Sequence, residues 1–215
     1  MDPGTVKSVF VGKPEIVQPK PEVYVSTAIF KKRVEGRVKV GELNLEGDAQ
    51  ADLTVHGGYS KAVYAYPFEH YQFWANELPE MTLGECQFGE NLSTLALLET
   101  ELCIGDKLGI GTAEFVVTQP RMPCYKLGIR FGRSDILRRF LKSRRSGFYL
   151  AVLKTGELEA GHEIEILERD VNRVSVDDIV RIYFEDKSDV ETMRRALRLE
   201  VLPEGWKEAF RVRMF

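Results

Sequence analysis

The sequence predicts a mainly β protein, in which an all-β barrel with inserted helices is followed by a small α-helical bundle. Short runs rich in β-branched and apolar residues recur at turn-rich intervals from residue 5 to residue 168. Long helices do not alternate with these runs, which disfavours a parallel α/β sheet. After Asp170 the pattern changes to short capped helices. We therefore divide the 215 residues into a barrel domain, 1–170, and a three-helix domain, 171–215.

The first third of the chain is predicted to consist mainly of strands. A loop carrying Pro14, Pro19 and Pro21 follows the first of them. A helix is predicted to open at Pro67 and to end before Pro79, because proline is tolerated in the first helical turn and disrupts the helix interior. The predicted strands are Thr5–Val11, Val23–Phe30, Arg37–Leu45 and Lys61–Tyr66.

The middle of the chain contains a predicted hairpin of Leu102–Gly109 and Ala113–Gln119, with Gly111 in its turn. Ser134 is a residue type favoured at helix N-caps, and an amphipathic helix is predicted directly after it, over Asp135–Lys142. Two strands with alternating apolar residues complete the predicted barrel: Gly147–Lys154 and Glu163–Glu168.

The C-terminal segment contains two S-x-x-[DE] capping boxes, which begin at Ser175 and Ser188 and each predict the start of a helix. A third helix is predicted from Pro203, with Trp206 and Phe210 one turn apart on its apolar face. None of the three helices carries a cluster of polar residues. We interpret them as elements that pack against the barrel or dock a partner.

Composition and charge exclude several classes of function. The net charge of −3 opposes general nucleic-acid binding, which requires a basic surface, but leaves room for a small basic pocket. The three scattered cysteines, Cys86, Cys103 and Cys124, match neither a disulfide framework nor a zinc cluster. The N-terminus lacks an apolar signal core, and no apolar run is long enough to span a membrane. We expect a cytoplasmic protein without nucleic-acid or membrane partners.

The segment VTQPRMPCYKLGIR, residues 117–130, contains the residue best suited to chemistry, Cys124. A proline on either side of this cysteine interrupts regular secondary structure. Arg121 and Lys126 flank the thiol, and positive charge there stabilises a thiolate or holds an anion. A thiolate serves as a soft-metal ligand or as a nucleophile. The alternative is a buried structural cysteine.

Two other loops carry residues suited to ligand binding. In the first, Gly57 and Gly58 let the backbone approach a ligand or present N–H groups to an anion. His56 and Lys61 on either side add a switchable donor and a positive charge. In the second loop, Asn91 can donate and accept hydrogen bonds at the edge of a ligand. Taken alone, each loop also fits an ordinary turn between strands.

The sequence lacks the other common enzyme motifs. Neither GxSxG nor HExxH occurs, and the glycines are too scattered for a phosphate-binding loop. A cysteine hydrolase could pair Cys124 with His56, but Arg121 and Lys126 indicate an anionic ligand as much as a scissile acyl group. The basic segment Ser143–Phe148 is interpreted as a solvated loop at a helix C-terminus.

Five motifs occur together and in order: TAIFK at 27–31, GDAQAD at 47–52, VHGGYSKAVYAY at 55–66, FGENL at 88–92 and QPRMPCYKL at 119–127. This set resembles the MOSC family, named for the C-terminal domain of molybdenum cofactor sulfurase. It resembles in particular the YiiM-like branch, in which a three-helix tail follows the domain. The resemblance covers essentially the whole chain. Ser60 departs from the pattern, which has an acidic residue before the lysine, and this departure bears on how Lys61 is oriented.

The resemblance implies a MOSC-type β-barrel of the pyruvate-kinase-barrel-like kind, with a pocket lined by these motifs. It implies that Cys124 ligates the molybdenum of a pterin cofactor or carries sulfur. The residues that it implies for holding the cofactor's phosphate, its oxo ligands or an anionic substrate are His56, Gly57, Gly58, Lys61, Asn91, Arg121 and Lys126.

The resemblance also implies reduction of N-hydroxylated compounds, such as hydroxylamino-purines, with electrons from an external flavoprotein. We expect the C-terminal helices to dock that donor or a second copy of the chain in a homodimer. The alternative is a module without redox turnover, in which Cys124 carries a persulfide or lines an anion-binding pocket. A further alternative is pyridoxal-phosphate binding through an imine with Lys61 or Lys126, although the sequence places no aspartate at the pyridine nitrogen.

Overall fold

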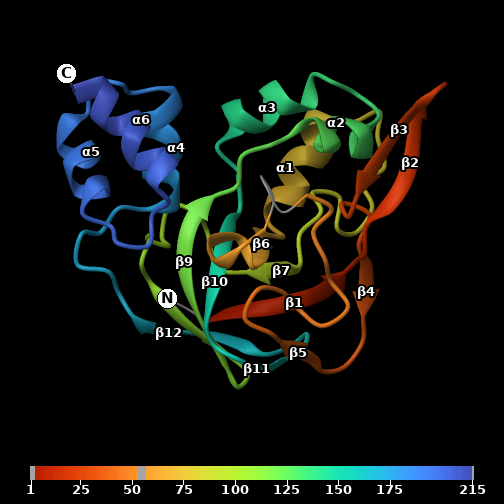
Figure 1. The fold of residues 1–215 in the computed structure, drawn as a ribbon, viewed down its shortest axis with the longest axis horizontal. Helices are drawn as coiled ribbons and strands as arrows, with labels where there is room; N and C mark the ends of the chain where they lie inside the picture. Colours follow the sequence, from red (N-terminus) through yellow and green to blue (C-terminus); the bar gives the residue numbers. More distant parts are fainter. Residues whose placement is uncertain (1–2, 53–56, 215) are drawn as a thin grey trace.

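The computed structural model describes residues 3–52 and 57–214, and in these ranges it contains a closed barrel (Figure 1). Going around the barrel, the strands are β12 (Glu163–Glu168), β8 (Lys107–Ile110), β9 (Ala113–Pro120), β10 (Phe148–Lys154), β6 (Val63–Pro67), β7 (Leu92–Leu95) and β1 (Gly4–Val11). Pairing of β1 with β12 closes the circle. All neighbours are antiparallel except β6 and β7, which are parallel. The predicted mainly β barrel with inserted helices is therefore confirmed.

Shorter strands extend the barrel. Strand β4 (Lys32–Val34) pairs with β1, and β5 (Val38–Val40) pairs with β11 (Gly156–Leu158). The predicted strand Arg37–Leu45 is thus reduced to three residues, and Leu45 makes only an isolated bridge to Val40.

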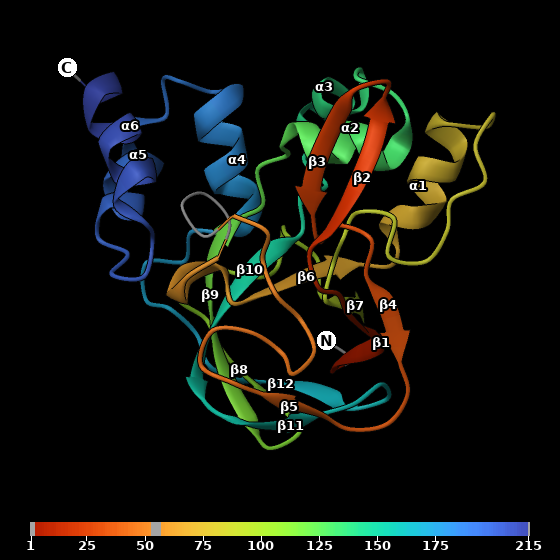
Figure 2. The ribbon, with the colours of Figure 1, turned by 45° about the vertical axis from the view of Figure 1, so that its right-hand side comes forward.

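A separate hairpin of β2 (Glu15–Lys20) and β3 (Val23–Thr27) stands away from the barrel in Figure 2. It corrects the prediction of a proline-rich loop. Pro19 is accommodated because the ladder changes register between Val17 and Lys20, so that no regular pairing is required of it. The predicted strand Val23–Phe30 ends at Thr27.

Strand β6 is buried on both faces, and each face contributes to a different apolar cluster. Val63 and Ala65 pack inside the barrel, whereas Tyr64 and Tyr66 belong to a second cluster outside it. Alternation of side chains along a strand produces this division. Three helices cover the second cluster (Figure 1): α1 (His70–Glu77), α2 (Tyr125–Phe131) and α3 (Ile136–Ser143).

The helices differ from the predictions in three places. Pro67 is the last residue of β6 and pairs with Thr94, so helix α1 begins only at His70. Helix α3 has Asp135 at its N-cap position, and the Asp135 carboxylate accepts hydrogen bonds from Arg133 and Arg139. Helix α2 was not predicted, because its seven residues follow two prolines and carry no capping motif.

The C-terminal helices are α4 (Val176–Phe184), α5 (Val190–Leu197) and α6 (Glu204–Met214). The capping box at Ser175 is confirmed, because its side chain accepts from the Asp178 backbone and the Asp178 carboxylate accepts in return. The second box is displaced by one residue: Asp189, not Ser188, caps α5 through a 3.0 Å bond from the Thr192 backbone N–H.

The apolar faces of these three helices join the same core cluster as the barrel interior. In Figure 1 they lie at one side of the barrel, beside β9. The division of the chain after residue 170 stays a prediction. Within the described residues, no helix combines the length and the apolar character needed to cross a membrane.

A glycine in the β8–β9 hairpin provides a test of the barrel. Gly111 has φ +61°, and a Cβ atom there would overlap the Glu157 carbonyl oxygen. We expect Gly111→Ala to lower the free energy of unfolding by about 3–4 kcal/mol, the sum of a left-handed backbone conformation and overpacking. Gly132→Ala is the matched control, because Gly132 has φ +65° with open space around it, and should cost about 1–2 kcal/mol. Equal losses in urea unfolding would contradict this reading.

Candidate functional site

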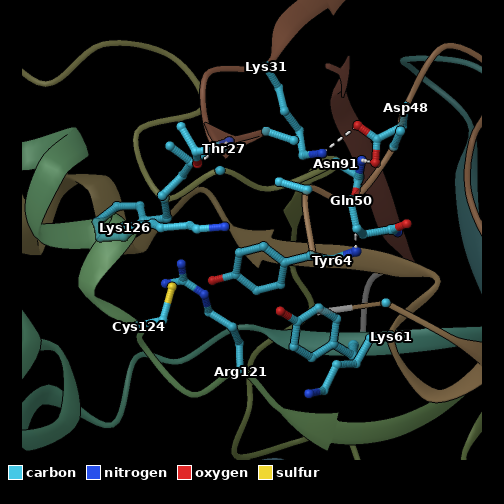
Figure 3. A pocket seen from close by; sticks show the side chains of 18 of the residues that line it. Thr27, Lys31, Asp48, Gln50, Lys61, Tyr64, Asn91, Arg121, Cys124 and Lys126 are labelled. Carbon is cyan, nitrogen blue, oxygen red and sulfur yellow. Dashed lines mark hydrogen bonds and ion pairs between the residues drawn. The ribbon is translucent and has the colours of Figure 1, made fainter. Parts of the chain in front are cut away.

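Residues from distant parts of the chain line one open pocket of about 680 Å³, including the solvent at its mouth (Figure 3). The segments that contribute to its walls are 27–31, 48–51, 57–64, 88–91 and 121–126, together with Tyr149. Five of these six contributions overlap the sequence motifs described above.

Cys124 lies in the short connection between β9 and α2. The strand ends at Pro120 and the helix begins at Tyr125, so that Cys124 is the residue immediately before the helix, with an extended backbone. Its side chain is part of the pocket wall and is only partly buried. None of the three cysteines of the chain forms a disulfide. The end of a rigid strand thus holds a reduced thiol at the pocket wall.

Arg121 is the most deeply buried cation of the pocket, with an exposed fraction of 6%. Its guanidinium lies 5.1 Å from the ring centre of Tyr64 and 5.2 Å from that of Phe140. Burial acts to lower the pKa of Arg121, but the ionisable groups around it, Tyr64, Tyr149 and Cys124, raise it overall, so the side chain stays charged.

One nitrogen of this guanidinium is left without a hydrogen-bond partner. Nη1 of Arg121 is buried and has no acceptor among the described residues. A buried charged donor without an acceptor costs about 1–3 kcal/mol, so such groups are rare unless a ligand completes them. The orphaned N–H of Arg121 is therefore a candidate donor for an anion or an oxo group in the pocket.

Two lysines add positive charge to the same space. Lys126 lies in the first turn of α2 and is buried, and Figure 3 shows its side chain directed into the pocket beside Cys124. Lys61 ends the short 3-10 helix η1 (Tyr59–Lys61), and burial lowers the pKa of its amine. A lowered pKa makes this lysine a better proton donor near neutral pH.

The opposite wall contains a polar network that includes a carboxylate. Asp48 forms an ion pair with Lys31 and accepts hydrogen bonds from the Gly12 backbone at 2.8 Å and from Nδ2 of Asn91 at 2.9 Å. Asn91 also donates to the Phe10 carbonyl at 3.2 Å. Both amide hydrogens of Asn91 are thereby used within the protein, so that this side chain positions Asp48.

Comparison with known proteins agrees with this architecture. The MOSC domain family model matches residues 52–165, and a "YiiM-like, 3-alpha helix domain" model matches residues 174–214. The chain belongs to the MOSC family.

Its relatives in the MOSC family include "Protein YiiM" of Escherichia coli (strain K12), 37% identical over 207 residues, with 95% of this chain and 90% of that protein covered. The "Uncharacterized protein YflK" of Bacillus subtilis (strain 168) is 36% identical over 206 residues, which cover 96% of this chain and 92% of that protein. A protein named "Reductase" from Gibberella moniliformis is 35% identical over 161 residues, which cover 74% of this chain but 28% of that protein.

Solved structures show the same fold over the full chain. The crystal structure of YiiM from Geobacillus stearothermophilus superposes with a TM-score of 0.82 at 31% identity, covering 99% of this chain and 100% of that chain. YiiM from Escherichia coli superposes with a TM-score of 0.74 at 30% identity, covering 98% and 90%.

The structure of this MOSC protein brings together most, but not all, of the residues predicted for the site. Those that line the pocket are Gly57, Lys61, Asn91, Arg121, Cys124 and Lys126. Gly58 is exposed, does not line the pocket, and supplies the carbonyl that accepts a hydrogen bond from the Lys61 backbone N–H at 3.0 Å. His56 lies outside the described residues.

Sequence reasoning missed four ionisable residues of the pocket: Lys31, Asp48, Tyr64 and Tyr149. Lys31 and Asp48 fall in two of the five motifs, but nothing in the sequence connected one to the other. Tyr64 and Tyr149 were assigned to strands, where an aromatic residue is expected in the core. Burial raises the pKa of both phenols above the ordinary value, so both remain protonated hydrogen-bond donors at neutral pH.

Two further sets of charged side chains do not line the pocket. The arginines of the basic segment Ser143–Phe148 make other contacts. Arg144 forms ion pairs with Asp177 and Glu185, and Arg145 stacks on a phenylalanine ring. Glu90 adds no charge to the pocket wall, because its buried carboxyl accepts hydrogen bonds from the Tyr71 hydroxyl at 2.6 Å and from the Ser93 hydroxyl at 3.1 Å.

The buried Glu90 gives a pH-dependent prediction. Burial raises its pKa above the ordinary 4.5, so the folded state holds this proton more tightly than the unfolded state does. The stabilisation that Glu90 contributes is therefore complete below pH 4.5 and declines as the pH rises through the raised pKa. Urea unfolding of the wild type and Glu90→Gln over a pH series should show the wild type losing stability relative to the variant with rising pH. A constant difference would contradict the raised pKa.

Proposed function

We propose that this MOSC protein reduces N-hydroxylated compounds, such as hydroxylamino-purines, with a molybdenum cofactor bound in the pocket and Cys124 as the protein ligand of the metal. The observation that carries the proposal is the convergence of one thiol and three cations, Arg121, Lys61 and Lys126, on a single cavity. In the reaction the N–O bond is broken, two electrons and two protons are consumed, and an amine and water are formed. An external flavoprotein would supply the electrons.

The residues of the pocket fit a pterin cofactor that carries a phosphate and an oxo-metal centre. A thiolate at Cys124 is a soft ligand suited to molybdenum. The unpartnered Nη1 of Arg121 offers a charged donor to an oxo ligand or a phosphate oxygen, and Lys126 adds a second cation beside the thiol. When bound, the cofactor supplies the two-electron centre of the reaction.

The chain's own side chains have separate tasks in this proposal. Tyr64 and Tyr149, whose rings lie 5.3 Å apart, form a protonated aromatic wall that limits access of water to Arg121. Lys61, with its lowered pKa, is suited to giving a proton to the departing hydroxyl group. Asp48 and Lys31 neutralise each other and stabilise the opposite wall without adding net charge.

The relative from Gibberella moniliformis, which is named a reductase, supports a redox function for the family. Because this chain spans only 28% of that protein, its substrate and partners are not transferred.

A second candidate uses the same thiol without redox turnover. The partly exposed side chain of Cys124 in a cation-lined pocket also suits a persulfide, whose negative charge Arg121 and Lys126 would stabilise. Pyridoxal phosphate is less well supported. Lys61 has the lowered pKa that imine formation requires, but the Asp48 carboxylate is already bound to Lys31 and to Asn91.

Replacing the thiol tests the metal site directly. We expect Cys124→Ser, produced in a host that makes the cofactor, to lose bound molybdenum measured by mass spectrometry of the metal, because a hydroxyl is a poor ligand for a soft centre. Cys103→Ser is the matched control, since Cys103 is buried away from the pocket, and should retain the metal. Metal retained in Cys124→Ser would refute the assignment, and an added sulfur atom on Cys124 without metal would favour the persulfide carrier.

Removing the buried cation tests the anion-binding role. We expect Arg121→Met to reduce molybdenum occupancy and reductase activity about tenfold or more, the equivalent of one charged hydrogen bond. Arg138→Met makes the same change of charge on the exposed face of α3 and should leave both quantities unaltered. If the two substitutions reduced molybdenum occupancy and activity equally, the effect would come from the change in net charge and not from loss of the unpartnered Arg121 donor.

A further inference from the structure

A buried hydrogen bond connects the last helix of the chain to the pocket. Nε1 of Trp206, on α6, donates to Oε1 of Gln119, in β9, at 3.0 Å. The exposed fractions of these side chains are only 8% and 4%. The two residues are 87 positions apart in the sequence, so this bond joins the C-terminal helices to the strand that leads directly to Arg121 and Cys124.

The other end of the Gln119 amide holds the turn that carries Lys61. Nε2 of Gln119 donates to the carbonyl oxygen and to the hydroxyl of Ser60, each at 3.2 Å. Thr118, the preceding residue of β9, donates to the same carbonyl at 2.7 Å. Ser60 belongs to η1 and directly precedes Lys61, whose side chain lines the pocket.

We infer that Trp206 is a positioning residue for the pocket, which acts through Gln119 and Ser60 to hold the turn that presents Lys61. The inference deepens the proposed function and rests on it only for the ligand that Lys61 contacts. It gives the C-terminal helices a defined part in building the site.

The physical reason lies in the amide of Gln119. An amide side chain can face either way, with its oxygen and its nitrogen exchanged. An indole N–H can only donate, so Trp206 requires the oxygen to face α6 and leaves the nitrogen for Ser60. Without this donor the amide loses its preferred orientation, and in the reversed one its oxygen would face the Ser60 carbonyl. Of the two bonds to the Ser60 carbonyl, only the one from Thr118 would then remain.

The test is hydrogen exchange of the full-length protein, followed by mass spectrometry. Trp206→Phe keeps an aromatic ring against Tyr183 and Phe210 and removes the indole donor together with one of the two fused rings. We expect it to accelerate exchange of the amides in residues 57–62, among them the Lys61 amide that bonds to Gly58, about tenfold. Unchanged exchange in this segment would overturn the inference.

The matched control is Phe210→Leu, which weakens the packing of α6 but retains the indole donor. Both variants are expected to melt at a lower temperature, but only Trp206→Phe should accelerate the segment. If Phe210→Leu accelerates it equally, Trp206 acts merely through the stability of the helix and the inference fails.

A double-mutant cycle identifies the route. Gln119→Met removes the hydrogen bonds of the amide to both Trp206 and Ser60. Adding Trp206→Phe to this variant should therefore not accelerate amide exchange in residues 57–62 any further. Additive effects would show that Trp206 does not act through Gln119, which would also overturn the inference.

The result of the exchange experiment can be distinguished from the result of the test of the proposed function. Exchange is measured without cofactor, so the connection can be verified even if the wild type binds no molybdenum. Where molybdenum is bound, Trp206→Phe should lower its occupancy more than Phe210→Leu does. If Cys124→Ser loses the metal, the proposed function is retained. If Trp206→Phe and Phe210→Leu then have equal molybdenum occupancy, the role of Trp206 is rejected.

Discussion

The buried guanidinium of Arg121 is the constraint on which the arrangement of the pocket depends. No carboxylate among the described residues forms a salt bridge with it, although burial of an uncompensated charge is strongly unfavourable. Two aromatic faces offset part of this cost: Tyr64 comes from β6 and Phe140 from α3. In the proposed function, an anion bound in the cavity would offset the rest of the cost. A barrel strand, an inserted helix and the end of β9 must therefore all be in place before the pocket exists.

Strand β6 explains how the fold creates two environments next to each other. Its inward side chains complete the barrel core, and its outward tyrosines form the cluster on which α1, α2 and α3 rest. The pocket opens beside this second cluster, so that its floor is aromatic and rigid while its rim is made of loops. A rigid floor suits a site whose groups must keep fixed separations.

Polar contacts between distant segments hold the rim. Lys31, Asp48 and Asn91 join three of the five motifs. Trp206 joins the C-terminal helices to the other two through Gln119 and Ser60. Arg144 adds a further connection to α4 through Asp177. The departure at Ser60 now has a structural meaning, because its hydroxyl accepts a hydrogen bond from Gln119 next to Lys61. The C-terminal helices are thus continuous with the barrel in both their apolar and their polar contacts.

The sequence by itself determined the class of the fold and the capping of α4 at Ser175. It also determined that Arg121, Cys124 and Lys126 lie close to one another. These features are local, because periodicity, capping and charge act within a few residues. Only the tertiary structure decided that Asp48 forms an ion pair with Lys31 and accepts a hydrogen bond from Asn91. It also decided that Glu90 is buried in the core. The hydrogen bond between Trp206 and Gln119 is a third contact of this kind. Such contacts depend on the closure of the barrel and on the packing of helices against it, which bring together residues far apart in the chain and which no local pattern specifies.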